Sequence, residues 1–352
     1  MIVEQFLSGF HSGDAVGNSV LHFHKFLIGR GIESRIVALT IDSNLRNQAV
    51  FLSDYCENPR ALKIYHFAIA SPLSEYFIRC LGKKVLLYHN VTPSRFFDGF
   101  SPQLACLTRE AREELKQVKD HCDFFIADSL FNAGELRQLG VADVFVFPVM
   151  LDGSDYDVPG SRFFASLFQD GKKNILFVGR ITPNKKIEDL IKILSFYKKF
   201  LSPEVRLIVA GNTRTLPRYY YALRELASRL QLTARDMVFT GHLPMDEFLA
   251  AYRTADVFVS MSEHEGFCLP LIESCCFGLP VVAYEAGAVS ETLAGAGLLL
   301  DRKDVAAAAV LIELVLNDAP LREQLRQSAL QRFASYQQQA RPEILLSYLE
   351  KL

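Results

Sequence analysis

Residues 257–278 read VFVSMSEHEGFCLPLIESCCFG, and this stretch passes from a strand through a loop into a helix. Val257–Ser260 is a short apolar run of β-branched and aromatic residues, which favours a buried strand. Pro270 suits the first position of a helix, because its missing N–H would have no partner there anyway. The loop between them carries Gly266, and a helix start with unpaired N–H groups is an anion site. The stretch therefore predicts a strand–loop–helix unit that can bind a phosphate group.

Two carboxylates lie in the same stretch. Glu265 lies in the loop, and Glu273 lies one turn into the predicted helix. Ionised carboxylates accept hydrogen bonds from hydroxyl groups. The loop carboxylate can therefore contact a sugar while the helix carboxylate contacts a ribose diol, with phosphates between them. An ordinary loop with two solvated glutamates is the alternative for this stretch taken alone.

A second charged loop follows an apolar run at residues 174–178. Residues 177–186 read FVGRITPNKK, and Arg180 and Lys185 lie in the loop that opens the next helix. Ligands of doubly wound sheets bind at the carboxyl ends of the strands. Arginine and lysine both bind phosphate oxygens, so these cations are expected to face an interdomain crevice. Ordinary surface cations are the alternative for this loop alone.

The whole chain alternates short β-rich runs with longer helical patterns, which is typical of parallel sheets with crossover helices. Residues 151–173 interrupt the alternation with a polar, turn-rich stretch. We therefore expect two doubly wound domains, at residues 1–150 and 174–334, joined by a linker at 151–173. The C-terminal helix, about 335–352, is expected to pack back on the first domain. The expected strands are Ile2–Phe6, Glu33–Ala38, Ala61–Tyr65, Lys84–Tyr88, Asp123–Ala127, Val144–Phe147, Asn174–Val178, Arg206–Ala210, Met237–Thr240, Val257–Ser260, Pro280–Ala283 and Gly297–Leu300.

The composition argues against several classes of protein. The formal net charge is −2, whereas a nucleic-acid binder normally carries a basic surplus. The seven cysteines form no CxxC pair, which favours free thiols in a reducing cytosol over disulfides or a zinc site. The sequence shows neither a signal peptide nor a membrane-spanning run, so we expect a cytoplasmic protein. The 27 phenylalanines leave peripheral contact with the inner face of the cytoplasmic membrane open.

With both loops described, the chain resembles glycosyltransferase family 4, the large family of retaining GT-B enzymes. The motifs that carry the resemblance are GR-x-x-x-x-K (Gly179, Arg180, Lys185), EGF-x-LP-x-x-E (Glu265 to Glu273) and C-x-G-x-P-V-V-A (residues 276–283). The resemblance covers essentially the whole chain. It implies an α/β fold of the GT-B type, in which two doubly wound Rossmann-like domains face a central cleft. The implied activity is transfer of a hexose from a nucleotide-diphosphate sugar, with retention at the anomeric carbon.

The resemblance also implies roles for individual residues. Arg180 and Lys185 would bind the donor diphosphate. Glu265 would contact the transferred sugar, and Glu273 would accept the ribose hydroxyls. His89, at a strand end, resembles the family's active-site histidine, although a histidine hydrogen-bonded within a turn is the alternative. The remaining implied donor-binding residues lie in three loops: Gly13, Asp14 and Ala15; Gly241, His242 and Leu243; and Gly266, Phe267, Cys268 and Leu269.

Two positions depart from the family pattern, and one motif belongs to another pattern. Lys186 stands where glycine is usual and Cys268 where glycine is commonest, so either residue can alter the geometry of its loop. A D-x-D motif, the metal motif of the other major glycosyltransferase fold, occurs at residues 155–157. It lies in the linker rather than at a strand end, and we interpret it as a coincidence. We therefore expect no essential metal and no cofactor beyond the nucleotide sugar.

The donor and the acceptor are less defined than the reaction. The segments SGDAVGN, YHNVTP and PNKKIEDLI are similar to those of bacterial enzymes that build surface polysaccharides. This similarity favours GDP-mannose or a related GDP-sugar, with a UDP-sugar as the alternative. A glycan or lipid-linked glycan is the expected acceptor. Phe96, Phe97 and Phe100 beside Arg95 either present an apolar and basic surface to a membrane-bound acceptor or pack into the core.

Three more distant alternatives remain. The first is an NAD-dependent oxidoreductase, although the chain has no clear GxGxxG turn followed by an acidic residue after the second strand. The second is a non-catalytic nucleotide-binding GT-B protein. The third is a different GT-B enzyme, such as a sugar epimerase or a phosphorylase.

Overall fold

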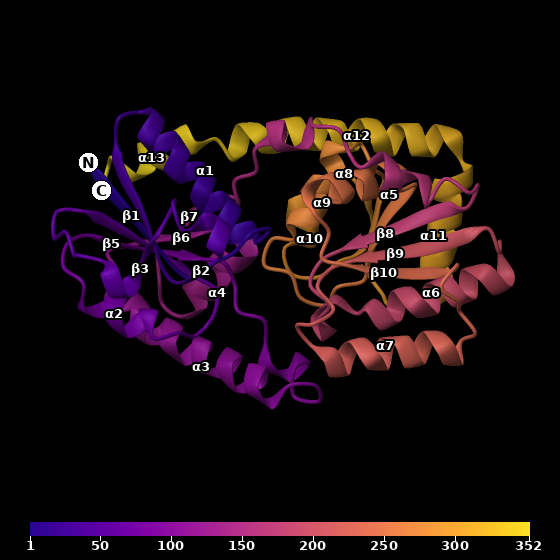
Figure 1. Ribbon diagram of the computed structural model, residues 1–352, viewed down its shortest axis with the longest axis horizontal. Coiled ribbons are helices and arrows are strands. Elements are labelled where there is room, and N and C mark those ends of the chain that lie inside the picture. Colours follow the sequence, from indigo (N-terminus) through magenta and orange to yellow (C-terminus); the bar gives the residue numbers. More distant parts are fainter. The chain divides into compact units, whose positions relative to one another are not determined.

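The structure is a computed structural model that describes residues 1–352, and the chain forms two compact units (Figure 1). Unit 1 contains residues 1–95, 102–152 and 337–352, and unit 2 contains residues 96–101 and 153–336. Each unit is built around one parallel sheet whose faces are covered by helices. None of the helices combines the length and the apolar character that a membrane crossing requires.

Unit 1 has a seven-stranded sheet. Its elements are β1 Ile2–Phe10, α1 Ala15–Gly29, β2 Glu33–Ile41, β3 Val50–Phe51, β4 Leu62–Phe67, α2 Leu73–Arg79, β5 Lys84–Tyr88, α3 Pro102–Lys119, β6 Phe124–Ala127, α4 Leu130–Gln138, β7 Phe145–Val146 and α13 Pro342–Leu349. The strand order is β3-β2-β1-β4-β5-β6-β7, so the chain first moves one way from β1 and later the other way from β4. Since crossovers between parallel strands are right-handed, this reversal places α1 on one face and α2, α3 and α4 on the other.

The core of unit 1 has two apolar layers, one on each face of the sheet. On one face Phe77 of α2, Leu115 of α3 and Leu136 of α4 pack against the strands. On the other face α13 joins α1 and packs Leu345 and its neighbours against the strands. The ring of Tyr348 in α13 stacks on a phenylalanine of β7 with centroids 4.1 Å apart. The last residues of the chain therefore complete the core of unit 1.

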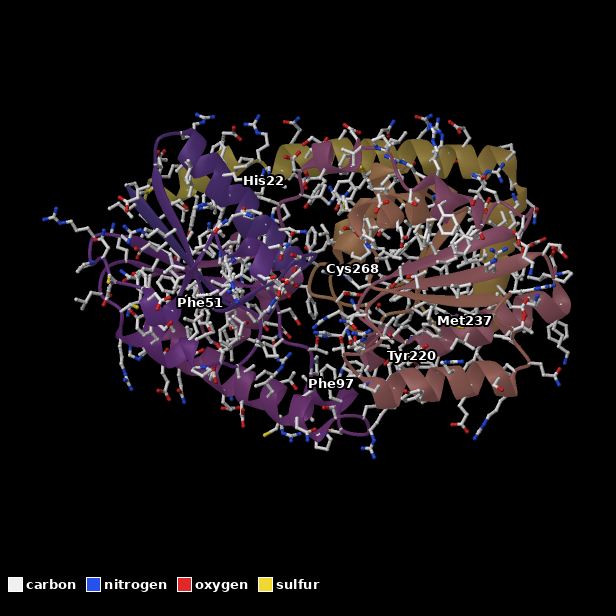
Figure 2. The ribbon with its side chains drawn as sticks, in the orientation of Figure 1. His22, Phe51, Phe97, Tyr220, Met237 and Cys268 are labelled. Atoms are coloured by element: carbon white, nitrogen blue, oxygen red, sulfur yellow. The ribbon has the colours of Figure 1, made fainter.

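Unit 2 has a six-stranded sheet in the order β10-β9-β8-β11-β12-β13. Its elements are α5 Arg162–Ser166, β8 Lys173–Val178, α6 Ile187–Phe200, β9 Val205–Ala210, α7 Pro217–Arg229, β10 Met237–Gly241, α8 Met245–Thr254, β11 Val257–Ser260, α9 Leu269–Cys276, β12 Val281–Tyr284, α10 Val289–Leu293, β13 Leu298–Leu300, α11 Val305–Asn317 and α12 Ala319–Gln339. Figure 1 shows α6 and α7 on one side of the strands and α5, α8 and α9 on the other. On the first side, Tyr220 of α7 packs edge-on against Phe239 of β10, with ring centroids 5.1 Å apart (Figure 2).

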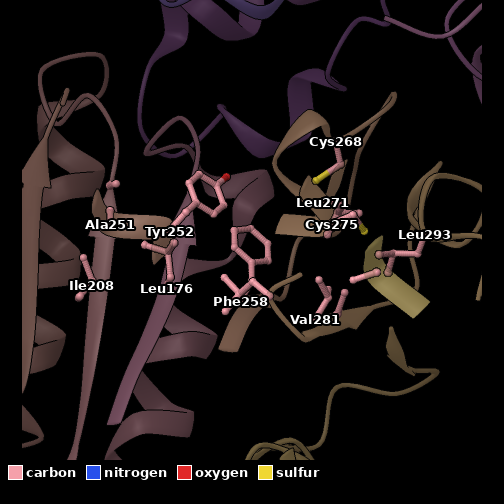
Figure 3. Packing of buried hydrophobic residues seen from close by; sticks show 14 of the residues in the cluster. Leu176, Ile208, Ala251, Tyr252, Phe258, Cys268, Leu271, Cys275, Val281 and Leu293 are labelled. Atoms are coloured by element: carbon pink, nitrogen blue, oxygen red, sulfur yellow. The ribbon is translucent and has the colours of Figure 1, made fainter. Parts of the chain in front are cut away.

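One apolar layer of unit 2 lies between the sheet and the helices that follow β10, β11 and β12. Figure 3 shows part of this cluster, in which apolar side chains of neighbouring strands pack against three helices. The strand residues are Leu176, Ile208, Phe258 and Val281, and the helix residues are Ala251, Tyr252, Leu271, Cys275 and Leu293. This packing fixes the start of α9 relative to the strand ends.

Each expected strand forms, with unchanged ends for Lys84–Tyr88 and Val257–Ser260 and shifted ends for the others. The structure differs from the prediction in two places. The short strand β3 was not predicted, because Val50–Phe51 is too short to show a periodic pattern. Residues 153–173, which were expected to belong to a linker, cluster with unit 2, which begins at Gly153. Phe164 and Phe168, spaced i and i+4, bury one face of α5 in the core of unit 2. The run was too short for this spacing to predict a helix.

Candidate functional site

The two charged loops identified in the sequence meet in unit 2, where its strand order reverses. The neighbouring strands β8 and β11 carry these loops at their carboxyl ends, and the loops lead to helices on opposite faces of the sheet. One loop runs from Gly179 to Lys186, and the other runs from Met261 to Cys268. Doubly wound sheets bind their ligands at such a point.

Lys185 and Glu265 form an ion pair between these loops. The Lys185 Nζ atom lies 2.7 Å from Glu265 Oε1 and 2.6 Å from Oε2. The side chains are only 12% and 6% exposed, respectively. Burial acts to raise the pKa of the Glu265 carboxyl, but Lys185, with hydrogen bonds from Ser262 and Cys268, lowers that pKa below its ordinary value. Arg180, on the same loop as Lys185, is exposed and forms no ion pair in the structure.

Asn184 joins the two loops and was missed in the sequence. Its backbone oxygen accepts a hydrogen bond from Glu263 N at 2.8 Å, and its side-chain Nδ2 donates to His264 O at 3.1 Å. The side chain is buried. Asn184 therefore holds the loop of Lys185 beside the loop of Glu265. In the sequence, only its position next to Lys185 pointed to this role.

A third segment, at the start of α10, supports the backbone of Glu265. Ala288 N donates to Glu265 O at 2.9 Å. A Cβ atom added at Gly287 would lie 2.3 Å from the same oxygen, and Gly287 has a φ of +58°. Only glycine allows this approach without a shift of the backbone. No local pattern in the sequence connects Gly287 with Glu265.

Glu273 is buried in α9 and has two tyrosine partners. Tyr156 OH donates to its Oε1 at 3.0 Å, and Tyr252 OH donates to its Oε2 at 2.8 Å. Burial raises the pKa of the Glu273 carboxyl above its ordinary value, although both hydroxyls act to lower it. The two glutamates of the same motif therefore have opposite pKa shifts, because only Glu265 has a cation beside it.

Tyr156 is the middle residue of the D-x-D motif. Asp155 and Asp157 are exposed, and only the tyrosine between them contacts Glu273. No group of three or more His, Cys, Asp or Glu side chains in the structure is arranged to hold a metal ion. Within this motif, the tyrosine is the residue that belongs to the candidate site.

Lys186 and Cys268, the two residues that stand where the family pattern has glycine, adopt backbone conformations that glycine favours. Lys186 has a φ of +51° and Cys268 a φ of +70°, both in the left-handed region. Lys186 precedes α6, and its Nζ atom lies 3.4 Å from Glu263. Cys268 precedes α9, which begins at Leu269 rather than at Pro270, and no side chain caps this helix. The start of α9 therefore lacks the side-chain acceptor that usually binds the N–H groups of a first helical turn.

The other residues expected to bind the donor lie in several environments. His242 is exposed, whereas the side chains of Leu243 and Phe267 are buried. Gly241 ends β10, and its oxygen accepts from Gly211 N at 2.9 Å. A Cβ atom added at Gly211 would lie only 1.9 Å from the backbone oxygen of Gly179. Gly211, which the sequence did not single out, therefore lets the ends of β8, β9 and β10 approach one another.

The residues predicted in unit 1 have partners of their own. Asp14 caps α1, because its side chain accepts a hydrogen bond from Gly17 N at 3.0 Å, and Gly13 and Ala15 flank this cap. His89 follows β5, and its side chain is only 4% exposed. Its Nδ1 atom lies 2.8 Å from Asp128 Oδ2, and its Nε2 atom lies 3.0 Å from His66 Nδ1. Both ring nitrogens of His89 therefore face buried partners.

The interpretation of the phenylalanine loop as a surface is wrong for two of its residues. Phe96 is 9% exposed and Phe97 is 4% exposed, and both cluster with unit 2. The Phe96 ring lies 6.2 Å from the His264 ring, and the Phe100 ring lies 5.1 Å from the Tyr219 ring. Ring–ring packing, rather than exposure to a membrane, accounts for these side chains.

A comparison with family models gives one match. Residues 161–332 match the family described as "Glycosyl transferases group 1". This region begins just before α5 and contains both charged loops, all of the strands of unit 2 and most of α12. It covers the ion pair of Lys185 with Glu265 as well as Glu273.

Curated relatives match at about 30% identity. A GDP-mannose-dependent alpha-mannosyltransferase of Corynebacterium glutamicum is 30% identical over 214 residues, which cover 58% of this chain and 48% of the relative. A D-inositol 3-phosphate glycosyltransferase of Nocardia farcinica is 30% identical over 237 residues, covering 65% of this chain and 51% of the relative. The chain thus spans about half the length of the curated relatives it matches.

Solved structures match the fold along the whole chain at low identity. Sucrose-phosphate synthase of Thermosynechococcus elongatus has a TM-score of 0.78 at 17% identity, with coverage of 100% of this chain and 98% of that chain. Anabaena HepE in complex with UDP and glucose has a TM-score of 0.75 at 16% identity, with full coverage of both chains. The fold of the chain is therefore the GT-B fold.

Proposed function

The chain belongs to the group 1 glycosyl transferases through its residues 161–332, and on that premise we propose that it is a retaining hexosyltransferase using a nucleotide-diphosphate sugar. The observation that carries the proposal is the ion pair of Lys185 with Glu265. It joins the loops of β8 and β11 at the point where doubly wound sheets bind ligands. In this proposal the diphosphate binds Lys185, and the transferred sugar lies against Glu265.

Lys185 keeps a hydrogen-bond donor for a phosphate although it is paired with Glu265. An ammonium group has three N–H donors, and Glu265 takes at most two of them in the structure. The third can donate to a phosphate oxygen. Arg180 is exposed and unpaired, so its guanidinium can bind a second oxygen without breaking an internal contact. The uncapped start of α9 adds backbone donors that favour an anion.

These groups stabilise the departure of the nucleoside diphosphate. The bond between the anomeric carbon and the diphosphate oxygen breaks, and the acceptor oxygen bonds to the same face of that carbon. The acceptor's proton passes to the departing phosphate oxygen. Negative charge grows on the diphosphate during this step, so fixed cations and N–H donors lower its barrier. We assign this stabilisation to Lys185, Arg180 and the start of α9.

Glu273 is assigned to the ribose. Each of its oxygens accepts one hydrogen bond from a tyrosine in the structure, and a carboxylate oxygen can accept a second. The remaining positions suit the two hydroxyls of a ribose diol. Tyr156 and Tyr252 orient the carboxylate for this contact, and they keep it from being a buried charge without a partner.

A GDP-sugar, with GDP-mannose first, is the donor we propose. The support is the Corynebacterium relative, which is named for GDP-mannose at 30% identity. A UDP-sugar is the second candidate, since the HepE structure, a likeness of fold alone, contains UDP. The proposed acceptor is a glycan or a lipid-linked glycan.

The test is release of nucleoside diphosphate from a panel of GDP- and UDP-sugars, measured with and without EDTA. We expect turnover with a GDP-sugar, and we expect the chelator to leave that rate unchanged because side-chain cations bind the diphosphate. The test variant is Lys185→Met, which should lose activity. Its matched control is Lys192→Met, a substitution at a half-exposed residue of α6. Loss of activity in both variants, or restoration of an EDTA-treated enzyme by Mn²⁺, would count against this site.

Ligand-induced stabilisation separates this proposal from its rivals. A ligand present at 100 times its Kd adds about 2.7 kcal/mol to the free energy of unfolding. We expect GDP or UDP to raise Tm and NAD to leave it unchanged. Stabilisation by NAD alone would favour an oxidoreductase. Stabilisation by GDP without turnover on any sugar donor would favour a non-catalytic nucleotide-binding protein.

A further inference from the structure

A chain of buried polar side chains crosses four neighbouring strands of unit 1. It begins at Gln5 on β1, continues through His66 near the end of β4 and His89 after β5, and ends at Asp128 after β6. Gln5, His66 and Asp128 are 1%, 5% and 4% exposed. The two imidazole rings lie nearly parallel, with centroids 5.2 Å apart and 10° between their planes. The proposed transferase reaction assigns no role to Gln5, His66 or Asp128.

The direction of the hydrogen bonds is set at the Gln5 end. The amide Nε2 of Gln5 donates to Val20 O at 3.2 Å, which turns its Oε1 toward His66. His66 Nε2 lies 3.2 Å from that oxygen. A carbonyl oxygen only accepts hydrogen bonds, so His66 Nε2 carries a proton. Burial, with the neighbouring His89, lowers the pKa of His66 well below its ordinary value, so its ring holds this one proton.

At the other end of the chain, Asp128 is also a hydrogen-bond acceptor, so the hydrogen bonds point toward it as well. The Oδ2 atom of Asp128 accepts from His89 Nδ1 at 2.8 Å, and its Oδ1 accepts from Asn132 Nδ2 at 2.9 Å. A carboxylate only accepts, so His89 Nδ1 carries a proton. His89 Nε2 then faces His66 Nδ1 at 3.0 Å. Because His66 Nδ1 has no proton to give, the donor in this contact is His89 Nε2.

We propose that His89 carries protons on both ring nitrogens and forms a buried imidazolium–carboxylate pair with Asp128. His66 and Gln5 are the positioning residues that impose this state, since the chain ends in an acceptor on both sides. Both N–H groups of His89 are then in use. The ring contributes a fixed positive charge next to a strand end, and it neither gives a proton to a ligand nor takes one.

The proposal is tested by nitrogen NMR of the protein labelled with ¹⁵N-histidine, with signals assigned from His66→Asn and His89→Asn variants. In the wild-type protein we expect two protonated ring nitrogens on His89 and a single one, Nε2, on His66. An unprotonated nitrogen on His89 would overturn the proposal without recourse to any further variant. The spectra report only on side chains of unit 1. Their result is therefore independent of whether the protein shows transferase activity.

A variant that does not touch His89 tests the positioning role. Gln5→Met removes the acceptor for His66 Nε2 at nearly the same side-chain length. His66 can then move its proton to Nδ1 and donate to His89, so we expect His89 to lose its second proton. The matched control is Gln138→Met, an exposed residue of α4 that should leave both rings as in the wild type. A doubly protonated His89 in folded Gln5→Met protein would refute the role of Gln5 and His66.

Discussion

The two units place charged clusters at the strand ends of similar parallel sheets, but one cluster is open and the other is closed. In unit 2, Lys185 and Glu265 pair with each other, while Arg180 on the same loop is exposed and unpaired. In unit 1, the ring nitrogens of His89 are both used by His66 and Asp128. The open cluster still has N–H donors for a phosphate, whereas in the closed cluster both ring nitrogens of His89 already have partners. In our two proposals, similar sheets therefore carry a reactive edge in unit 2 and a fixed charge in unit 1.

The largest expected effect is on turnover in the open cluster. Lys185→Ala and Arg180→Ala should each lower kcat by a factor of 100 to 1,000, roughly 3–4 kcal/mol of lost transition-state stabilisation. Each substitution removes a cation whose interaction strengthens as the diphosphate departs. Steady-state kinetics with the donor identified from the panel measures this loss. A variant that keeps more than half of the wild-type rate would remove its residue from the mechanism.

A comparable effect, on stability rather than turnover, is expected in the closed cluster. Asp128→Asn leaves His89 without its carboxylate, and breaking a buried ion pair typically costs about 3 kcal/mol. We expect a lower midpoint in urea unfolding of unit 1, together with unchanged binding of free nucleoside diphosphate to unit 2. A variant that weakened nucleotide binding tenfold while keeping its stability would erase the contrast between the two clusters.

The next effect separates the two glutamates of unit 2. Glu273→Gln should raise the donor Km about tenfold, or about 1.4 kcal/mol, with a smaller change in kcat, because a ribose contact is present before and during reaction. Glu265→Gln should lower kcat more than it raises Km, since its proposed partner is the reacting sugar. Binding of free nucleoside diphosphate provides the control. If Glu265→Gln loses that binding while Glu273→Gln keeps it, the two assignments are reversed.

The opposite pKa shifts of these glutamates predict opposite pH dependences of stability. For Glu265 the folded pKa lies below the ordinary 4.5, so its stabilisation is complete above that value and is lost as pH falls through the folded pKa. For Glu273 the folded pKa lies above 4.5, so stability falls as pH rises from 4.5 through the folded pKa. Measured against the wild type, the Tm of Glu273→Gln should be higher at pH 7 than at pH 4. The Tm of Glu265→Gln, on the same scale, should be lower at pH 7 than at pH 4.

The smallest effects are expected at the two left-handed residues beside the open cluster. Cys268→Gly relieves a backbone strain on the order of 1 kcal/mol, but glycine gains entropy in the unfolded chain, so the net gain should be about 0.5 kcal/mol. Lys186→Gly should gain less, because it also loses the contact with Glu263. Thermal unfolding measures both changes. A loss of more than about 1 kcal/mol in Cys268→Gly would show that its thiol contributes more than its backbone costs.

The sequence predicted the open cluster better than the closed one, for a physical reason. Lys185, Glu265 and Glu273 lie in two continuous motifs, each of which contains a strand end and a helix start, so their positions followed from local pattern. Gln5 lies on β1 and Asp128 directly follows β6, two strands that are far apart in the sequence, and no local pattern connects the two residues. His89 was found at its strand end, but only the structure shows that its ring is buried.

The same reason explains the residues missed in unit 2. Tyr156 was dismissed with its D-x-D motif because its partner, Glu273, lies far along the sequence. Gly287 and Gly211 act through close backbone approach, which composition does not reveal. Apart from β3, the strands of both sheets were predicted because buried parallel strands form continuous apolar runs. The short helix α5 was not predicted because two phenylalanines one helical turn apart are too few to indicate a helix.

The interrupted order of the units along the chain has a consequence for biosynthesis. The core of unit 1 includes Leu345, Leu346 and Leu349 of α13, which are synthesised after the whole of unit 2. Unit 2 ends at Tyr336, so all of its strands and core helices are synthesised before α13. Domains generally fold as units during synthesis, in the order in which they become complete. The sheet of unit 1, although it is synthesised first, therefore lacks the α13 part of its core until unit 2 has been synthesised.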